Sequence, residues 1–456
     1  MKMSFFKNQS PAQDALANEP VRSLLLKMAG PSIVAMVMQA LYNTVDSMYV
    51  SRISSGSMAA VTLAYPVQMI MGALSTGIGV GINSSISRSL GEKDQKKAAA
   101  AASNGLSLGL VTVAVMILFG IFGAEPFVRM YTTDPEVLAG GIIYVRTICF
   151  LSVGSVFSQL CFSVLQGSGS MVIPMLSQIS GGIIVILLDP VLIFSMNLGI
   201  LGAAIASSFA QIVSMLIGLY GIFKKNHENL PVTFRGFRPD IEIIKDIMTV
   251  GIPSALTQAT TSIVAGIINK EIAVYGTDAV TLYGSFTKLN SFATLPVFGV
   301  TRGMNPILGF CTGEKNKDRF LETRNFAMVL ANGWTFLAFL AFQLAPVTLL
   351  AMMNIKGDLV PEGITTYRVL SMSLMIMGNS IVMTQLFAPV KKSYISMISA
   401  LLRQVVLLVP LTLYLGNIYG IHGIWIGIVC ADFLNYLFVI VMNIWLRRKV
   451  LNTWAA

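Results

Sequence analysis

Long apolar segments, separated by short polar connections, run along almost the whole chain from Leu24 to Leu446. Each segment is longer than the roughly 18 residues that an α-helix needs to cross a hydrocarbon core about 30 Å thick. The pattern therefore predicts an all-α integral membrane protein with twelve transmembrane helices. The expected helices cover residues 24–50, 59–87, 98–122, 137–165, 171–196, 200–223, 244–270, 279–310, 325–350, 363–388, 393–416 and 421–446.

The composition supports this reading. Of the 456 residues, 55% are hydrophobic and only 11% are charged, whereas about a quarter of the residues of a soluble domain are charged. The chain begins with a polar segment that includes Lys2, Lys7 and Asp14. Because no short apolar stretch there ends at a cleavage site, we expect the first apolar segment to be a permanent helix.

The basic residues account for the formal net charge of +10 and predict the orientation of the chain. They concentrate at the amino terminus, in the even-numbered connections and at the carboxy terminus, while the odd-numbered connections hold Arg52, Arg129 and Lys356. This positive-inside pattern predicts a multi-pass protein of the cell membrane with both termini in the cytoplasm. Nucleic-acid binding is not expected from this distribution.

The sequence carries no signature of an enzyme or of a zinc site. Four cysteines lie singly in apolar segments, and the two histidines are far apart. None of these spacings is typical of zinc binding. The motifs GxxxxGK[ST], HExxH and GxSxG do not occur, so we expect neither ATP hydrolysis nor another enzymatic activity, and no cofactor.

The second half of the sequence repeats the first. Gly81-Ile82-Asn83 and Gly91-Glu92-Lys93 recur at one constant offset as Gly303-Met304-Asn305 and Gly313-Glu314-Lys315. Six helices in each half give both halves the same orientation. We therefore expect two six-helix lobes that are related by a parallel repeat about an axis along the membrane normal.

The domain organisation follows from the repeat and the longest polar stretch. We expect a cytoplasmic N-terminal segment at 1–23, a first lobe at 24–223, a cytoplasmic linker at 224–243, a second lobe at 244–446 and a cytoplasmic tail at 447–456. Two similar lobes joined by a linker can rock about a site between them.

Ionisable residues inside apolar segments are functional candidates, because a charge in hydrocarbon is costly unless it faces a partner or a cavity. Gln39, Asn43 and Asp46 share one face of the first helix. Tyr42 lies one turn before Asp46, and Pro31, in the same helix, is a candidate hinge.

Asp189 follows a long apolar run in the fifth helix and precedes Pro190. Asp46 and Asp189 are expected at similar depth in one lobe, where two carboxylates can share a proton. Together with Asn43, Tyr42 and backbone carbonyls, they could equally supply the oxygen ligands of a hard cation such as Na⁺. The alternative is that one aspartate only satisfies a neighbouring hydroxyl or caps a broken helix.

The second half differs chemically, since its first helix carries Thr261 and other hydroxyl residues in place of the acid. Basic residues appear instead, among them Lys288, Arg302 and Arg403, and Asp432 is the expected structural counter-ion of Arg403. The residues expected to line a substrate cavity are Gln39, Tyr65, Gln68, Thr261, Tyr283 and Lys288.

Several motifs together resemble the multidrug and toxic compound extrusion (MATE) family, most of all its bacterial multidrug-efflux branch, over nearly the whole chain. These motifs are Gly30-Pro31-Ser32, Asp46-Ser47-Met48-Tyr49-Val50, Leu165-Gln166-Gly167-x-Gly169, Leu188-Asp189-Pro190-Val191-Leu192-Ile193-Phe194 and Gly199-Ile200-x-Gly202.

The resemblance implies an antiporter that exports bulky cationic compounds through a V-shaped pair of lobes. It also assigns cation coupling to Tyr42, Asp46 and Asp189 and, at the family's Thr position, to Ser207. Two positions depart from the family pattern: Val185 replaces a common Asn, and Thr261 stands where some branches carry a Glu.

These observations predict a cation-coupled antiporter, driven by H⁺ or Na⁺, that exports bulky, mostly cationic amphipathic drugs by alternating access. Tyr65 and Tyr283 would hold a cationic substrate through their ring faces. The expected partners are small organic cations and membrane lipids, and the expected functional unit is a monomer. The alternative is a flippase for lipid-linked sugar or peptidoglycan precursors, with Lys288, Arg302 and Arg403 lining a basic cavity.

Overall fold

The computed structural model describes residues 11–50, 55–132, 134–196, 198–225, 230–232 and 239–454. Within these ranges the chain forms helices joined by short turns, without a β-strand. The first ten residues of the N-terminal segment and half of the predicted linker 224–243, residues 226–229 and 233–238, lie outside the described residues. The prediction of an all-α protein is confirmed.

The twelve predicted segments all coincide with helical stretches, several of which are divided by a bend or a wider turn. The N-terminal half consists of α1 (Pro11–Asn18), α2 (Val21–Val50), α3 (Ser55–Gly91), α4 (Gln95–Leu118), η1 (Phe119–Gly123), α5 (Ala124–Arg129), α6 (Pro135–Phe150), α7 (Ser152–Gly167), α8 (Val172–Pro190), η2 (Val191–Ser195), α9 (Gly199–Tyr220) and η3 (Gly221–Lys225).

The C-terminal half follows the same order. It consists of α10 (Ile241–Ala273), α11 (Thr277–Glu314), α12 (Lys317–Leu344), α13 (Pro346–Met352), α14 (Leu359–Ser371), α15 (Leu374–Gln385), α16 (Ser393–Leu401), η4 (Leu402–Leu408), α17 (Val409–Tyr419), α18 (Ile421–Lys449) and η5 (Leu451–Trp454).

Hydropathy alone detects fewer spans than the fold contains. In the described ranges nine helical stretches are long and apolar enough to cross a membrane, and the pair Val137–Phe150 and Ser152–Gly167, bent by 44°, makes up to ten. Although α11 is 38 residues long, its polar residues, including Lys288, Asn290 and Arg302, lower its hydropathy. The pair α14 and α15 is interrupted at Met372 and Ser373.

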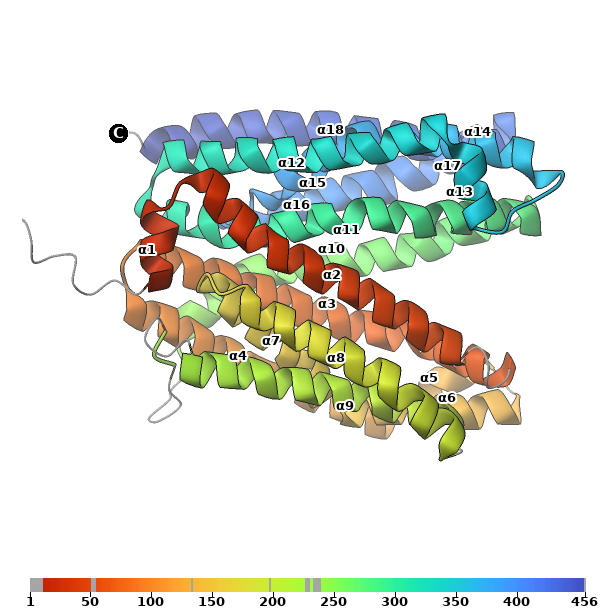
Figure 1. Ribbon diagram of the computed structural model, residues 1–456, viewed down its shortest axis with the longest axis horizontal. Helices are drawn as coiled ribbons and strands as arrows, with labels where there is room; N and C mark the ends of the chain where they lie inside the picture. The colour runs from red at the N-terminus through yellow and green to blue at the C-terminus, as the bar shows by residue number, and fades with distance from the viewer. Residues whose placement is uncertain are drawn as a thin grey trace, which may run out of the picture.

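The two halves form two lobes that meet at one end and diverge toward the other, giving a V (Figure 1). We call the end that carries α1 and the C terminus the closed end, and the opposite end the open end. One continuous core at the closed end contains residues of both lobes, including Ile82, Leu160, Met304 and Phe387. Toward the open end each lobe has its own cluster of buried apolar residues.

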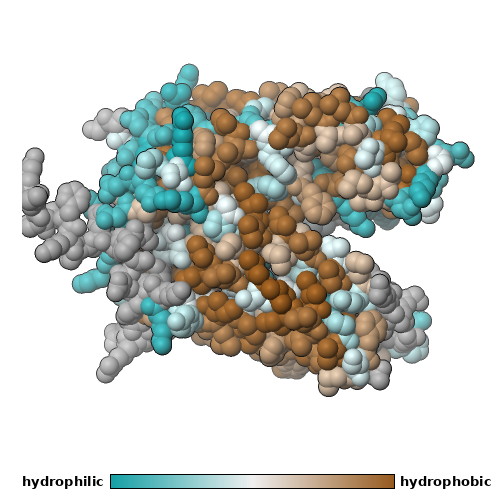
Figure 2. All heavy atoms as spheres, viewed as in Figure 1, coloured by the Kyte–Doolittle hydropathy of each residue, from teal (hydrophilic) through white to brown (hydrophobic). Residues whose placement is uncertain are grey.

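Apolar side chains cover the outside of both lobes in a broad band, and polar residues gather at the two ends (Figure 2). Leu110 and Val115 on α4, for example, are 60% and 51% exposed. An apolar band of this kind between two polar ends is the surface that a bilayer covers.

Glycines allow the helices of the two lobes to approach closely at the closed end. A Cβ atom on Gly303 of α11 would meet the backbone of Ala29 on α2, and one on Gly81 of α3 would meet the backbone of Ile247 on α10. Because Gly81 and Gly303 are equivalent positions of the repeat, the two seams between the lobes are related by its pseudo-twofold axis. Close backbone approach through small residues is a common way for helices to pack in membranes.

A side chain at Gly303 should separate the lobes. We expect Gly303→Leu to lower the free energy of unfolding by at least about 1–3 kcal/mol, because the added atoms overlap the backbone of α2. The measurement is thermal unfolding of the purified protein in detergent. Gly333→Leu on α12 is the matched control, because a Cβ atom there meets nothing within 4 Å; equal losses in both variants would contradict the seam.

Candidate functional site

The two aspartates predicted to act together face each other in the N-terminal lobe. Asp46 lies near the end of α2 and Asp189 near the end of α8, and their carboxyl groups are within hydrogen-bonding reach of one another. The Asp189 side chain is completely buried. A hydrogen bond between two carboxyl groups requires that one of them carries a proton, since a carboxylate is only an acceptor.

The carboxyl oxygens of this pair have few hydrogen-bond donors among the described residues. From the described residues, no donor reaches either carboxyl oxygen of Asp189 or Oδ1 of Asp46. Buried polar groups in proteins almost always have partners, so an unsatisfied cluster indicates a ligand or a function. Two acidic groups without donors are chemically suited to a proton or a metal cation.

Local sequence explains where Asp189 sits. Pro190 has no backbone N–H and therefore cannot continue the regular helical hydrogen bonding of α8. The chain continues as the wider turn η2, Val191–Ser195. This break in the last turn holds Asp189 at a defined place opposite α2, and π-type turns of this kind are frequent at functional sites.

Tyr42 and Ser207 line a small cavity close to the two aspartates. This cavity of about 20 Å³ lies between α2, α8 and α9, and Val185 and Gln211 also line it. Its volume is enough for one water molecule. The Tyr42 hydroxyl hydrogen-bonds the side chains of Gln211 and Gln39.

The aliphatic side chain of Val185 occupies the wall where the family commonly has Asn. The cavity therefore offers the hydroxyls of Tyr42 and Ser207 and the Gln211 amide, but no oxygen from position 185. In the described part of the chain, no group of three or more His, Cys, Asp or Glu residues could hold a metal ion. A cation bound here would rely on the two carboxylates and on neutral oxygens.

The sequence prediction missed two residues of this site. Tyr144 of α6 is only 4% exposed and lies close enough to both aspartates to interact with them electrostatically. Its hydroxyl accepts a 3.2 Å hydrogen bond from Nε2 of Gln68. Gln211 of α9 bonds Tyr42. Both are single polar residues in apolar segments, and no motif or helical spacing in the sequence connects them with the two aspartates.

A larger polar cavity lies within the C-terminal lobe. It has a volume of about 370 Å³, within the range of drug-binding pockets. Thr261 lines it and accepts a 2.9 Å hydrogen bond from Gln404. The predicted ion pair between Arg403 and Asp432 is present in its wall, so the cavity is close to neutral. The remaining lining residues include Thr257, Asn290, Thr294, Phe298, Ser373, Met377, Ser380, Ser396 and Asn435.

The other predicted cavity residues lie elsewhere. Tyr283 stacks on Trp425 with ring centroids 5.6 Å apart. Lys288 is exposed, and Tyr65 is 54% exposed. Asn43, which was predicted as a ligand of the coupling cation, is exposed on α2. The structure thus brings Asp46, Asp189, Tyr42, Ser207, Gln39 and Gln68 into one region of the N-terminal lobe, and places Thr261 in a separate cavity.

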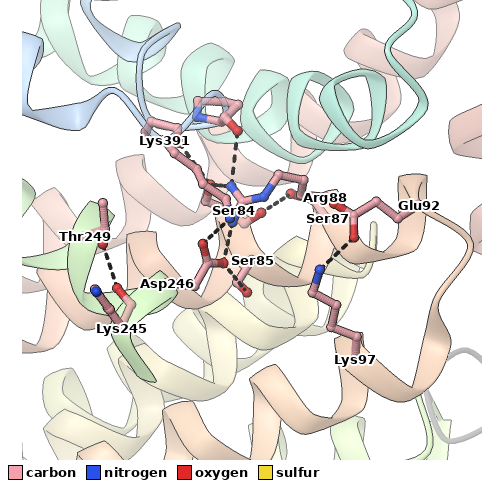
Figure 3. A network of polar contacts seen from close by, with 12 residues as sticks. Ser84, Ser85, Ser87, Arg88, Glu92, Lys97, Lys245, Asp246, Thr249 and Lys391 are labelled. Carbon is pink, nitrogen blue, oxygen red and sulfur yellow. Dashed lines mark hydrogen bonds and ion pairs between the residues drawn. The ribbon is translucent and has the colours of Figure 1, made fainter. Parts of the chain in front are cut away.

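Charged residues fasten the lobes together at the closed end (Figure 3). Arg88 of α3 forms an ion pair with Asp246 of α10, and Lys391 approaches the other carboxylate oxygen. Ser85 donates a 2.9 Å hydrogen bond to Asp246, and Arg88 also donates to the Pro389 carbonyl. We call this network the closed-end latch. Because Arg88 is 6% exposed, loss of its partner would leave a buried charge.

The latch should contribute more than an ordinary surface pair. We expect Asp246→Asn to reduce the free energy of unfolding by about 3 kcal/mol, because it leaves Arg88 buried without a counter-ion. Glu125→Gln is the matched control, since Glu125 and Arg129 are largely exposed and such pairs contribute about 0–1 kcal/mol. Thermal unfolding measures both, and similar losses would show that the latch is only a surface contact.

Comparison with known proteins places this geometry among membrane transporters. The family model MatE matches residues 31–191 and 253–414, one match in each lobe. The multidrug export protein MepA of Staphylococcus aureus strain MSSA476 is 24% identical over 444 residues, covering 94% of this chain and 95% of that protein. MepA of Staphylococcus saprophyticus is 23% identical over 434 residues, with coverage of 93% and 94%.

Solved structures agree over nearly the full length. A transporter of the MOP superfamily from Pyrococcus furiosus, described as having a binding pocket of reverse polarity, superimposes with a TM-score of 0.89 at 25% identity, covering 98% of this chain and 99% of that one. An outward-facing multidrug resistance MATE transporter superimposes with a TM-score of 0.90 at 26% identity, with the same coverage. These similarities confirm the two-lobe, twelve-helix fold.

Proposed function

Because this chain belongs to the MatE family of membrane transporters, we propose that it exports bulky, mostly cationic amphipathic compounds in exchange for H⁺ or Na⁺. The observation that carries the proposal is the pair of the half-buried Asp46 and the fully buried Asp189, in which three of the four carboxyl oxygens have no donor among the described residues. Such a pair favours binding of a cation. Its position in one wall of a V lets cation binding act on the opening between the lobes.

The V shape supports an alternating-access cycle. The positive-inside pattern puts the closed end, which carries the C terminus, on the cytoplasmic side, so the open end faces outward. Transport would then require the closed-end latch to break and the open end to close. Both termini lie in the cytoplasm in this arrangement, and one chain supplies both lobes, which suits a functional monomer in the cell membrane.

The cation and the substrate compete through charge. A cationic compound entering from the cytoplasm gains from the carboxylates while they are negative. When H⁺ or Na⁺ binds the pair from outside, that attraction is lost and the compound leaves. Pro31 lies inside α2, fifteen residues before Asp46, where a bend can transmit cation binding to the interface with α11.

Two regions can receive substrate. The N-terminal lobe presents Gln39, Gln68 and Tyr65 near the aspartates, and the C-terminal lobe contains the cavity of about 370 Å³ with Thr261 in its wall. Because Asp432 neutralises Arg403 in that cavity, it suits uncharged or aromatic parts of a substrate. A flippase for anionic lipid-linked precursors would need several unpaired basic residues there, so the cavity favours export of drugs.

Efflux from proteoliposomes tests the proposal. A fluorescent organic cation is loaded, and its export is driven separately by a pH gradient and by a sodium gradient. We expect one of the gradients to drive export by the wild-type protein, and Asp46→Asn and Asp189→Asn each to reduce the initial rate by at least about tenfold, because an amide neither takes up a proton at neutral pH nor supplies a negative charge to hold Na⁺.

Glu125→Gln removes an exposed acid from the same lobe and should keep the wild-type rate. Thermal unfolding of all variants separates loss of coupling from loss of folding. Gradient-driven export by Asp46→Asn at the wild-type rate would exclude the carboxylate pair as the coupling site. Absence of export by the wild-type protein under both gradients would contradict cation-coupled antiport.

A further inference from the structure

Arg302 is a cation without a counter-ion in the middle of the molecule. It lies on α11 twelve residues before the end of that helix at Glu314, about 18 Å along the helix axis. Among the described residues it forms no ion pair, and no hydrogen bond is made by its guanidinium. Charged groups at such depth nearly always have a partner, because desolvation without compensation costs several kcal/mol.

The guanidinium faces a cavity between the lobes, directly inward of the closed-end latch. The cavity has a volume of about 60 Å³ and is also lined by Ser84 and Pro389 of the latch region. Its volume suits a few water-sized atoms, whereas drug-sized ligands need cavities of about 300 Å³ or more. Its occupant must therefore be small.

The internal repeat explains why the charge is uncompensated. Asn83 and Asn305, which are equivalent positions, both line the cavity, as do Val80 and its equivalent Arg302. The cavity therefore lies on the pseudo-twofold axis, and the first half supplies valine where the second supplies arginine. No acidic residue lines the cavity.

The rest of the wall is rich in unused donors. The side-chain amides of Asn83, Gln159 and Gln166 in the N-terminal lobe make no hydrogen bond within the described ranges. Asn305 lines the opposite wall, where its Oδ1 acceptor is buried without a partner among the described residues; this oxygen needs a donor such as water and does not itself bind an anion. A positive charge that shares a cavity with side-chain amides able to donate, and with no carboxylate in the lining given by the described residues, is a suitable environment for an anion.

We propose that this cavity binds a small monovalent anion of the chloride class, held between Arg302 of the C-terminal lobe and the amides of Asn83, Gln159 and Gln166 of the N-terminal lobe. The anion neutralises Arg302 and links the two lobes. It therefore stabilises the arrangement in which the closed end is shut, and it must leave or lose half of its ligands when the lobes part there.

Anion replacement in the purified full-length protein tests the site. Thermal unfolding is followed while gluconate is replaced by chloride at constant ionic strength and constant cation concentration. A ligand that binds only the folded state raises the unfolding temperature in a saturable manner. We expect a rise of several degrees for the wild-type protein, a smaller rise for Arg302→Lys, and none for Arg302→Gln.

Arg368→Gln is the matched control, because Arg368 is exposed on α14 of the same lobe and its loss should leave the chloride response unchanged. If Arg302→Gln does not fold, crystals of the wild-type protein grown with bromide provide the second measurement. An anomalous peak beside the Arg302 guanidinium supports the site. An equal chloride response in Arg302→Gln, no response in the wild-type protein, or bromide-containing crystals without that peak would overturn it.

Discussion

The rule that a charge in hydrocarbon must have a partner shapes every polar feature of this protein. Arg403 has Asp432, and Arg88 has Asp246. In both pairs each charge is neutralised by its partner within the protein, and both pairs stabilise the fold. Asp46 with Asp189, and Arg302, are incomplete. Arg302 lies between the lobes and the aspartate pair lies within the first, so the groups that lack a partner are separate from the ion pairs that only support the fold.

The internal duplication explains how the two lobes are arranged, and the differences between the two halves explain where the charged residues lie. Equivalent glycines, Gly81 and Gly303, form equivalent seams between the lobes. The charges, however, differ between equivalent positions. The acid pair belongs to the first lobe, while the second has Thr261 in a larger neutral cavity and Arg302 on the axis. A symmetric scaffold with asymmetric charges can couple one lobe to an ion and leave the other to shape the substrate path.

Much of the fold could be predicted from the sequence because hydropathy and helix length report directly on the bilayer. All twelve segments were found, and the repeat gave the two lobes. The meeting of Asp46 with Asp189 could also be expected, since each is an isolated acid at similar depth in a neighbouring helix. The ion pair of Arg403 with Asp432 was predicted for the same reason.

Other parts of the site could not be predicted, because they depend on contacts between distant segments. Tyr144 and Gln211 are lone polar residues whose importance appears only when α6 and α9 pack beside the aspartates. Arg88, Asp246 and Lys391 look like ordinary charges near helix ends, and only the packing of the lobes shows that they meet. Lys288 and Tyr283 were predicted to line the substrate cavity because their helix carries many polar residues; they do not line the cavity around Thr261, and their role in a substrate path stays a prediction.

The position of the seams has a mechanical consequence. The glycines that contact the opposite lobe along α3 run from Gly77 to Gly91 at its end, a length of about 21 Å, while the rest of the helix extends about 33 Å beyond them. Each lobe is therefore a lever with a short arm at the closed end and a long arm at the open end. A tilt of only about 10° at the seam moves the far end of α3 by roughly 6 Å. Small shifts of the backbones that meet at these glycines would therefore change the width of the open end far more than the spacing at the seam.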